Sequence, residues 1–395
     1  MTDTNEIVTL SLDETDLEPA TVYAKLRSYT PGRASFLFES RQHDAPAGRY
    51  SIVGYRVRSG EMMPPAVDAI GAQLDGYARH DARPTFAEAM AHASVGFFSH
   101  ANANSIHGIR HWEDESISGY FLLGATVVVF DHQERSITVA GRKAGRVAER
   151  CVWELRNGPE PAPLAAALAG ALPVDLRATL DEEQLAARLA RAKRFLGEPV
   201  SELALAHSLH APMRGADPFD VYRALRAAST APSLYFIDFG SSPVTPPLQL
   251  LGVAAEPMVM RRAHADAGAA ANELGAELRA CFPGRAVVGS EPADAARIVR
   301  RLEDTSREFV GAAVGYLGPG AVSCFVLAER AIAARGGSFE LACTVPLGPA
   351  TDPVAAARAA RDAVGLELAA IRAAQDAAPV TDAAAPAEPV APPSS

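Results

Sequence analysis

The feature that most constrains the fold is a run of β-branched and aromatic residues from Tyr120 to Phe130. A polar segment, Asp131 to Arg135, follows this run, and strand-forming residues resume from Ser136 to Ala140. This order predicts two strands joined by a tight turn. Because other segments between Thr21 and Ala140 have a similar composition, the first part of the chain is predicted to consist mainly of β structure.

The second half has a different pattern, in which helix and strand signals alternate. Asp181 to Gln184 has capping-box spacing, and the apolar stripe that follows predicts a helix that Gly197 closes. Pro218 to Arg226 predicts a short amphipathic helix, and Leu234 to Phe239 predicts a buried strand. The alternation continues to about Ala374.

A Pro- and Ala-rich stretch, residues 157–178, separates the two patterns and has the composition of a linker between structural units. We therefore predict a β-rich N-terminal domain over residues 1–156 and a second domain over residues 179–375. The last segment, residues 376–395, is almost entirely Ala, Pro, Thr, Ser and acidic residues, which bury too little apolar surface to offset the entropy lost on ordering. It is predicted to be a disordered tail.

Composition limits the classes of function. The chain has 395 residues and a formal net charge of −10, and its basic residues are dispersed, which argues against a nucleic-acid partner. No apolar run is long enough to cross a bilayer, and the first residues lack the features of a secretory signal, so a cytoplasmic location without membrane contact is expected. The four cysteines are widely separated and predict neither a zinc motif nor a disulfide framework.

Several ordered motifs in the first half resemble those of one family. They are Phe36 to Ser40, Gly48 to Gly54, Val95 to Phe98 and Ala125 to His132. The chain resembles the large, chorismate-using subunit of anthranilate synthase (component I) and of aminodeoxychorismate synthase. The resemblance implies the α+β, two-domain fold of the chorismate-utilising enzymes, with large, mostly antiparallel sheets covered by helices, here shortened in the C-terminal half.

The second half matches the family in pieces, and three family-pattern residues, Gly289, Gly315 and Tyr316, remain in it. After Val259 the likeness breaks, and some tens of residues that carry a metal-binding Glu and a catalytic His in the family are missing. The family's Arg that grips a substrate carboxylate is represented by Glu329. The resemblance therefore implies a degenerate, truncated catalytic half that has lost ligands of the family's Mg²⁺, and no metal or other cofactor is expected.

The departure from the family extends to two other elements. The family's Gly-rich turn is represented by Ala342 to Pro346, and its Glu-rich helix by Val354 to Arg358. The close backbone approach that glycine permits and the metal ligation that Glu provides are both expected to be lost there. The segments that stay close to the family pattern are mainly ones expected to pack in the core.

In feedback-regulated members of the family, the Leu-x-Glu-Ser segment helps to form an allosteric site for tryptophan. The resemblance implies an effector site here with Leu37, Glu39, Ser40, Pro232 and Leu234. A carboxylate such as that of Glu39 can pair with the ammonium group of an amino acid. The family has an aromatic residue where this chain has a serine before Leu234, so the ligand could differ from tryptophan, and Glu39 could equally pair within the protein.

The leading hypothesis is a catalytically inactive anthranilate synthase component I-like protein that binds a ligand or a partner in aromatic amino-acid or chorismate-derived metabolism. The partner could be a glutamine amidotransferase subunit or an active large-subunit homologue, and the ligand an aromatic amino acid. The alternative is an active chorismate-converting lyase, an anthranilate or aminodeoxychorismate synthase large subunit with a rebuilt site that uses Glu202, His207 or Glu256. An odd separation places Glu202 and His207 on opposite faces of a strand. A third possibility is a structural protein without a ligand.

Overall fold

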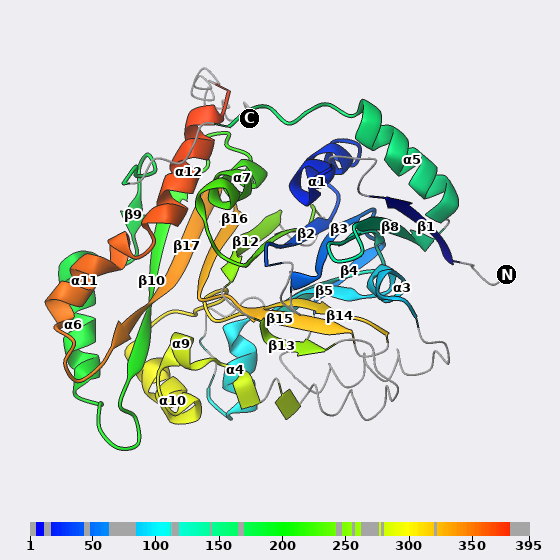
Figure 1. Ribbon diagram of the computed structural model, residues 1–395. Coiled ribbons are helices and arrows are strands. Elements are labelled where there is room, and N and C mark those ends of the chain that lie inside the picture. The colour runs from blue at the N-terminus through cyan, green and yellow to red at the C-terminus, as the bar shows by residue number, and fades with distance from the viewer. Residues whose placement is uncertain are drawn as a thin grey trace, which may run out of the picture.

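The computed structural model describes residues 5–11, 17–42, 48–62, 84–110, 112, 118–142, 144–164, 170–241, 247–254, 257–261, 276–277, 280–319 and 322–379. In this part of the chain, helices cover one face of a large antiparallel sheet, and a smaller antiparallel sheet lies on the other face (Figure 1). The α+β fold with large antiparallel sheets covered by helices, which the sequence predicts, is confirmed.

The large sheet has eleven strands, and each is antiparallel to its neighbours. In spatial order they are β1 (Asn5–Ser11), β8 (Ser136–Arg142), β7 (Thr126–Asp131), β3 (Tyr50–Tyr55), β2 (Ser35–Ser40), β11 (Ser233–Asp238), β12 (Leu248–Ala254), β16 (Arg330–Arg335), β17 (Ser338–Leu347), β10 (Leu203–Pro212) and β9 (Arg177–Ala178). The two halves of the chain meet at the pairing of β2 with β11.

The small sheet has six strands, which in spatial order are β13 (Pro257–Arg261), β15 (Ser323–Leu327), β14 (Ala313–Leu317), β5 (Ser94–Phe98), β6 (Gly119–Leu123) and β4 (Ser59–Met62). Here the halves meet at the pairing of β14 with β5. Both sheets therefore combine strands from before and after residues 157–178, and the two predicted domains share their sheets. The position of the boundary stays a prediction.

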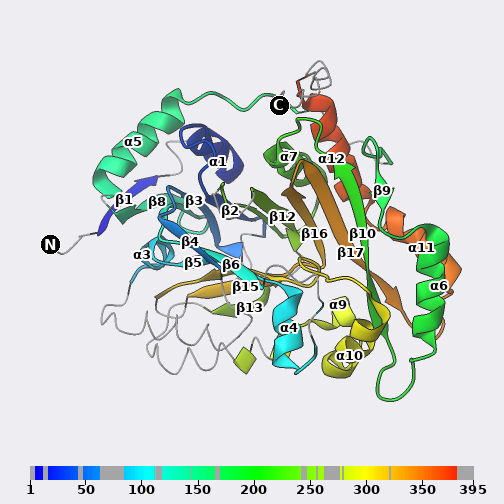
Figure 2. The ribbon, with the colours of Figure 1, turned by 180° about the vertical axis from the view of Figure 1, so that it is seen from behind.

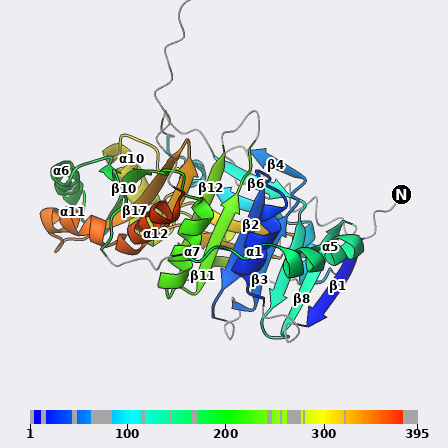
Figure 3. The same ribbon diagram turned by 90° about the horizontal axis from the view of Figure 1, so that it is seen from above.

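The helices that the structure describes lie on both sides of the large sheet (Figures 1 and 3). Along one face run α1 (Pro19–Ser28), α5 (Ala144–Asn157), α6 (Glu182–Lys193), α7 (Pro218–Ala228), α11 (Pro353–Asp362) and α12 (Gly365–Ala377). On the side of the small sheet lie α3 (Phe86–Ala91), α4 (His100–Ile106), α9 (Arg285–Val288) and α10 (Pro292–Leu302). Figure 2 shows α4, α9 and α10 gathered near one end of β10 and β17.

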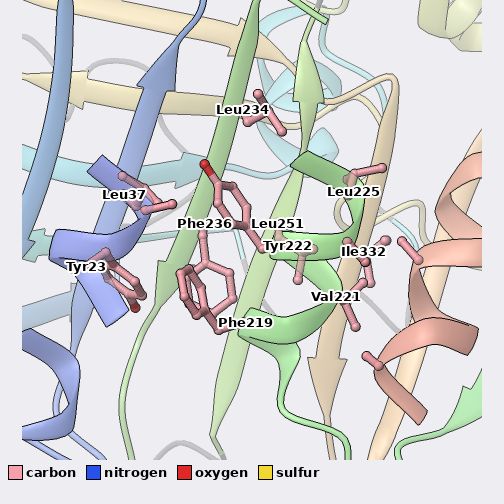
Figure 4. Packing of buried hydrophobic residues seen from close by; sticks show 14 of the residues in the cluster. Tyr23, Leu37, Phe219, Val221, Tyr222, Leu225, Leu234, Phe236, Leu251 and Ile332 are labelled. Atoms are coloured by element: carbon pink, nitrogen blue, oxygen red, sulfur yellow. The ribbon is translucent and has the colours of Figure 1, made fainter. Parts of the chain in front are cut away.

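Two hydrophobic layers hold these elements together. In the first, α1 and α7 pack on the large sheet through aromatic side chains, with ring centroids of Tyr23 and Phe219 4.7 Å apart and those of Phe219 and Phe236 5.3 Å apart (Figure 4). The second fills the space between the two sheets and includes Phe36 and Phe97. Because burying such a side chain stabilises the fold by about 1.5–3 kcal/mol, the first layer holds these helices on the large sheet and the second holds the two sheets together.

The run from Tyr120 to Phe130 differs from its prediction as one strand of a hairpin. It divides at Gly124, whose φ of +60° turns the chain, so that β6 joins the small sheet and only β7 pairs with β8 in the large sheet. A local pattern of β-formers does not show this break, because both strands are buried and have the same composition. Thr21, which was predicted to begin the β-rich region, lies in α1 instead.

The helix predicted to open the second half is confirmed by its capping box. Asp181 Oδ1 accepts a hydrogen bond from Gln184 N at 2.8 Å, and Gln184 Oε1 accepts one from Asp181 N at 3.1 Å. The helix ends at Lys193, before Gly197. The predicted disordered tail overlaps α12 at its first two residues, and residues 380–395 lie outside the described part of the chain. None of the described helices is long and apolar enough to span a membrane.

Candidate functional site

Glu202 lies just before β10, on the face of the large sheet that α9 contacts. Its carboxylate accepts hydrogen bonds from Arg285 Nε at 3.2 Å and from Arg285 Nη2 at 2.7 Å, which raises the pKa of Arg285. The side chains of Glu202 and Arg285 are 50% and 66% exposed, so water screens the pair. A neighbouring cation thus engages Glu202, which the sequence proposed as an acid or base.

A backbone seam joins the segment after α9 to the start of β10. Gly289 forms an isolated antiparallel bridge with Leu203, and Ser290 N donates to Glu202 O at 3.0 Å. The Ser290 hydroxyl accepts hydrogen bonds from Ser201 N at 2.8 Å and from Glu202 N at 3.0 Å. The chain itself therefore closes the edge of β10 beside Glu202.

Gly289→Ala is expected to destabilise the protein through this seam. Gly289 has a φ of +118°, and an added Cβ would lie 2.0 Å from Glu202 O. Backbone strain and overpacking together are expected to lower the free energy of unfolding, measured by urea denaturation, by about 2–4 kcal/mol. The control is Gly336→Ala, where φ is also positive but no atom lies within 4 Å of the added Cβ. A loss no larger than that of the control would contradict the close approach at Gly289.

A buried ion pair between Glu303 and Arg307 lies next to the seam. Their side chains are 2% and 0% exposed, and Arg307 Nε and Nη2 donate to the two carboxylate oxygens of Glu303 at 2.7 and 2.6 Å. Arg307 also donates to Val287 O at 2.6 Å and Ala204 O at 2.7 Å, while Glu303 accepts from Ala206 N at 2.7 Å. These bonds tie α9 and the end of α10 to the edge of β10.

The other segments that the resemblance matches to the family's catalytic elements lie in a strand, a turn and a helix. Ala342 to Pro346 lies inside the continuous strand β17, and Thr344 Oγ1 donates to Ala286 O of α9 at 3.2 Å. Glu329 is exposed in the turn between β15 and β16. Val354 to Arg358 lies in α11 and includes no carboxylate. Among the residues that the structure describes, no group of three or more His, Cys, Asp or Glu side chains is placed to hold a metal ion.

His207 lies on the opposite face of β10 from Glu202, in contact with the layer formed by α6 and α11. Its side chain is 5% exposed, and Nδ1 has no hydrogen-bond partner in the described part of the chain. Burial and the positive charge of Arg361 lower the pKa of the imidazole. Because the sheet separates the two side chains, Glu202 and His207 cannot act together on one substrate atom.

Of the residues of the predicted effector site, Glu39 and Ser40 line one cavity, whereas Leu37 and Leu234 do not. Leu37 and Leu234 are 0% and 1% exposed and belong to the core between the large sheet and its helices (Figure 4). Ser40 is buried, and Pro232 O accepts a hydrogen bond from Arg41 N at 2.8 Å. Two of the five residues are therefore packed in the core, and their side chains contribute no polar contact to a ligand.

Glu39, the fifth predicted effector residue, is bound by two side chains of α7. Arg226 Nε donates to both carboxylate oxygens at 2.8 Å, and Tyr222 Oη donates to Oε2 at 2.9 Å. Burial and the negative charge of Glu39 raise the pKa of Tyr222, so its hydroxyl stays protonated as a donor. Glu39 and Arg226 line a cavity of about 300 Å³. Within the protein, a guanidinium group thus takes the place that a ligand's ammonium group would need.

The family-pattern residues have packing roles. Gly315 lies in β14, where an added Cβ would be 1.9 Å from the carbonyl oxygen of Cys324 in β15, so only glycine allows the strands to pair at this point. The ring of Tyr316 packs edge-on against Phe38, with centroids 5.8 Å apart. Glu256, a candidate catalytic residue, lies outside the described residues.

The sequence motifs did not mark the arginines that organise these regions. Arg226 follows Tyr222 by four residues in a predicted helix, a spacing that places both on one side of it and could have marked them as partners. Glu303 and Arg307 have the same spacing. Nothing in the local sequence marks Arg285 as the partner of Glu202, because that contact joins positions 83 residues apart.

Comparisons with known proteins place this arrangement in a family. A family described as chorismate binding enzyme matches residues 62–266, just over half of the chain. The chain belongs to the chorismate binding enzyme family. It is 30% identical over 249 residues to anthranilate synthase component 1 of Streptomyces coelicolor, and the match covers 57% of this chain and 47% of that protein. The chain therefore spans about half the length of this curated relative.

Solved structures show the same fold. Anthranilate synthase component I from Streptococcus pneumoniae TIGR4 superposes with a TM-score of 0.64 at 16% identity, covering 89% of this chain and 99% of that one. The menaquinone-specific isochorismate synthase from Escherichia coli gives a TM-score of 0.62 at 12% identity, covering 93% and 95%. This member of the chorismate binding enzyme family thus keeps the architecture of both structures at low sequence identity.

Proposed function

We propose that this chain is a catalytically inactive, anthranilate synthase component I-like member of the chorismate binding enzyme family. It acts as a ligand-binding or partner-binding regulatory subunit in aromatic amino-acid or chorismate-derived metabolism. One observation carries the proposal: at the end of β10 that bears Glu202, other groups of the protein already bind the carboxylate and the backbone. Arg285 pairs with Glu202, and the segment from Gly289 to Ser290 bonds to the adjoining backbone.

The described residues at this end of the sheet do not fit the Mg²⁺ on which the family relies. Mg²⁺ requires oxygen ligands, usually one or two carboxylates, and here the carboxylates of Glu202 and Glu303 are both held by arginines. The segment from Val354 to Arg358 of α11, which the resemblance matches to the family's Glu-rich helix, includes no carboxylate. We therefore propose that the chain works without Mg²⁺, and no catalytic step is assigned to it.

A partner subunit is part of the proposal. The relative from Streptomyces coelicolor is named component 1, which denotes one part of a multi-component enzyme. We propose that this chain binds either a glutamine amidotransferase subunit or an active large-subunit homologue. The shared fold supports this, because an inactive homologue can keep a docking surface after its chemistry is lost. Pull-down of the tagged chain from its host, read by mass spectrometry, is expected to recover one of these two proteins.

Purified protein is expected to convert no chorismate. The assay supplies chorismate, Mg²⁺ and ammonia, and it follows loss of chorismate and gain of anthranilate fluorescence. Anthranilate synthase component 1 of Streptomyces coelicolor, assayed in parallel, is the positive control. No turnover is expected because the carboxylate of Glu202 is paired with Arg285, and His207, the other candidate on this strand, lies on the opposite face of the sheet.

Mg²⁺-dependent turnover would favour the rival function, an active lyase with a rebuilt site. In that case Glu202→Gln or Glu256→Gln should abolish it, because each removes a carboxylate that the rival requires. Arg297→Gln is the matched control, since this exposed arginine of α10 pairs only with Asp294 and the His107 carbonyl oxygen in the described structure. Turnover that is lost only in the two glutamate variants would overturn the proposal.

A further inference from the structure

We infer that a cavity between α6 and α11, over His207 of β10, binds a small organic carboxylate with an apolar body. The cavity has a volume of about 450 Å³, and its walls include Leu180, Leu185, His207, Ala357, Arg358 and Arg361. This volume is within the range of about 300–1,000 Å³ that small-molecule sites have. The inference does not depend on the proposed function, because the cavity and Glu202 lie on opposite faces of the large sheet.

His207 forms the floor of this cavity and is the buried polar group that points to a ligand. Its side chain is 5% exposed, and no described residue accepts from or donates to Nδ1. Buried polar atoms in folded proteins nearly always have a hydrogen-bond partner, so the unpartnered Nδ1 of a residue that lines a cavity calls for one. The lowered pKa keeps the ring neutral near pH 7, and a neutral imidazole offers one N–H donor and one acceptor.

The charges around the cavity favour an anion. Arg361 has no ion-pair partner among the residues described, and it is the charged group whose field acts on the imidazole. Arg358 donates from Nε to Glu182 at 3.2 Å, with both side chains more than half exposed, so this weak pair can open. Asp181 is occupied as the N-cap of α6. Asp362 remains as a carboxylate at the rim, and Arg361 beside it offsets its charge.

The rest of the wall selects for an apolar body. Its accessible apolar part is formed by Ala178 and Leu180, which are half-buried, and the fully buried Leu185 and Ala357 pack behind them. A carboxylate can accept hydrogen bonds from Arg361 and from the imidazole of His207 while a ring or branched chain covers these apolar groups. An inorganic anion would satisfy the charge alone and would leave the apolar wall in contact with water.

The test is calorimetric titration of the full chain with benzoate, with cyclohexylamine and inorganic phosphate as comparison probes. Benzoate is expected to bind, phosphate to bind about tenfold more weakly or not at all, and cyclohexylamine not to bind. Arg361→Gln and His207→Leu should each raise the Kd for benzoate by about tenfold or more. Arg372→Gln, which removes an exposed arginine of α12 that pairs with Asp376, should leave the Kd within about twofold.

Nuclear magnetic resonance of the histidine side chains gives a second readout, since the ring nitrogen signals of His207 should shift on addition of benzoate. If His207→Leu does not fold, the exposed Arg361 still allows the test. The inference is overturned if benzoate fails to bind at millimolar concentration, if Arg361→Gln leaves the Kd unchanged, or if cyclohexylamine binds as well as benzoate. Chorismate turnover in the separate assay would overturn the proposed function and leave this site untouched.

Discussion

Replacing Arg307 with methionine is expected to lower the free energy of unfolding by about 3–5 kcal/mol, the largest loss expected for any single change considered for this protein. The variant leaves Glu303 as a buried charge without its cation, and it removes the donors to the carbonyl oxygens of Val287 and Ala204. Breaking a buried pair is costly because the remaining charge stays desolvated. Urea denaturation followed by circular dichroism measures the change.

A double-mutant cycle separates the pair from its surroundings. The double variant Glu303→Leu with Arg307→Met leaves no unpaired charge. Its loss of unfolding free energy should therefore be smaller, by at least about 1.5 kcal/mol, than the sum of the losses in the two single variants. Arg297→Met is the matched control, because Arg297 lies in α10, the helix that ends just before Glu303. It should change the free energy of unfolding by less than about 0.5 kcal/mol, since its partner Asp294 is exposed. A loss below about 1 kcal/mol for Arg307→Met would show that Glu303 is not held as described.

Arg226→Met is expected to lower the free energy of unfolding by about 2–3 kcal/mol, less than Arg307→Met because the Arg226 side chain is 24% exposed. The change leaves the Glu39 carboxylate, which is 4% exposed, without its cation, and among the described residues it keeps only the hydrogen bond from Tyr222. The same variant frees Glu39 for an ammonium group. We therefore expect tryptophan to raise the melting temperature of the variant more than that of the wild type.

Arg223→Met is the control for this change, because Arg223 lies one turn earlier on α7 and pairs with the partly exposed Asp220. It should lose less than about 1 kcal/mol, and tryptophan should shift its melting temperature no more than that of the wild type. If Arg226→Met is as stable as this control, Arg226 does not hold the Glu39 carboxylate in the way the ion pair indicates. If tryptophan stabilises the wild type strongly, Glu39 is available for a ligand despite Arg226.

Parts of this fold could be predicted because their causes are local. The capping box at Asp181, the amphipathic helix after Asp217 and the strand around Leu234 each follow from residues within a few positions of one another. The resemblance added the family and its architecture. The same reasoning predicted one strand from Tyr120 to Phe130, because composition does not show that the chain passes from one sheet to the other at Gly124.

The candidate sites were harder to predict than the fold. Sequence reasoning found Glu39 and Glu202 but not the arginines that hold them, and these partners lie 187 and 83 residues away along the chain. It placed Leu37 and Leu234 at a ligand, whereas both pack in the core. Residue types and spacing show which groups could do chemistry, but whether a group is free or already paired depends on what the fold brings beside it.

By itself the sequence determined the mixed helix and sheet architecture and the family, because these depend on residue type, on ordered motifs and on short-range periodicity. The tertiary structure alone decided that both sheets combine strands from the two halves, that Arg285 and Arg226 pair with the carboxylates of Glu202 and Glu39, and that His207 lines a separate cavity. The physical reason is that burial and pairing are set by contacts between distant segments. Such contacts form only when the chain has packed, and no local pattern encodes them.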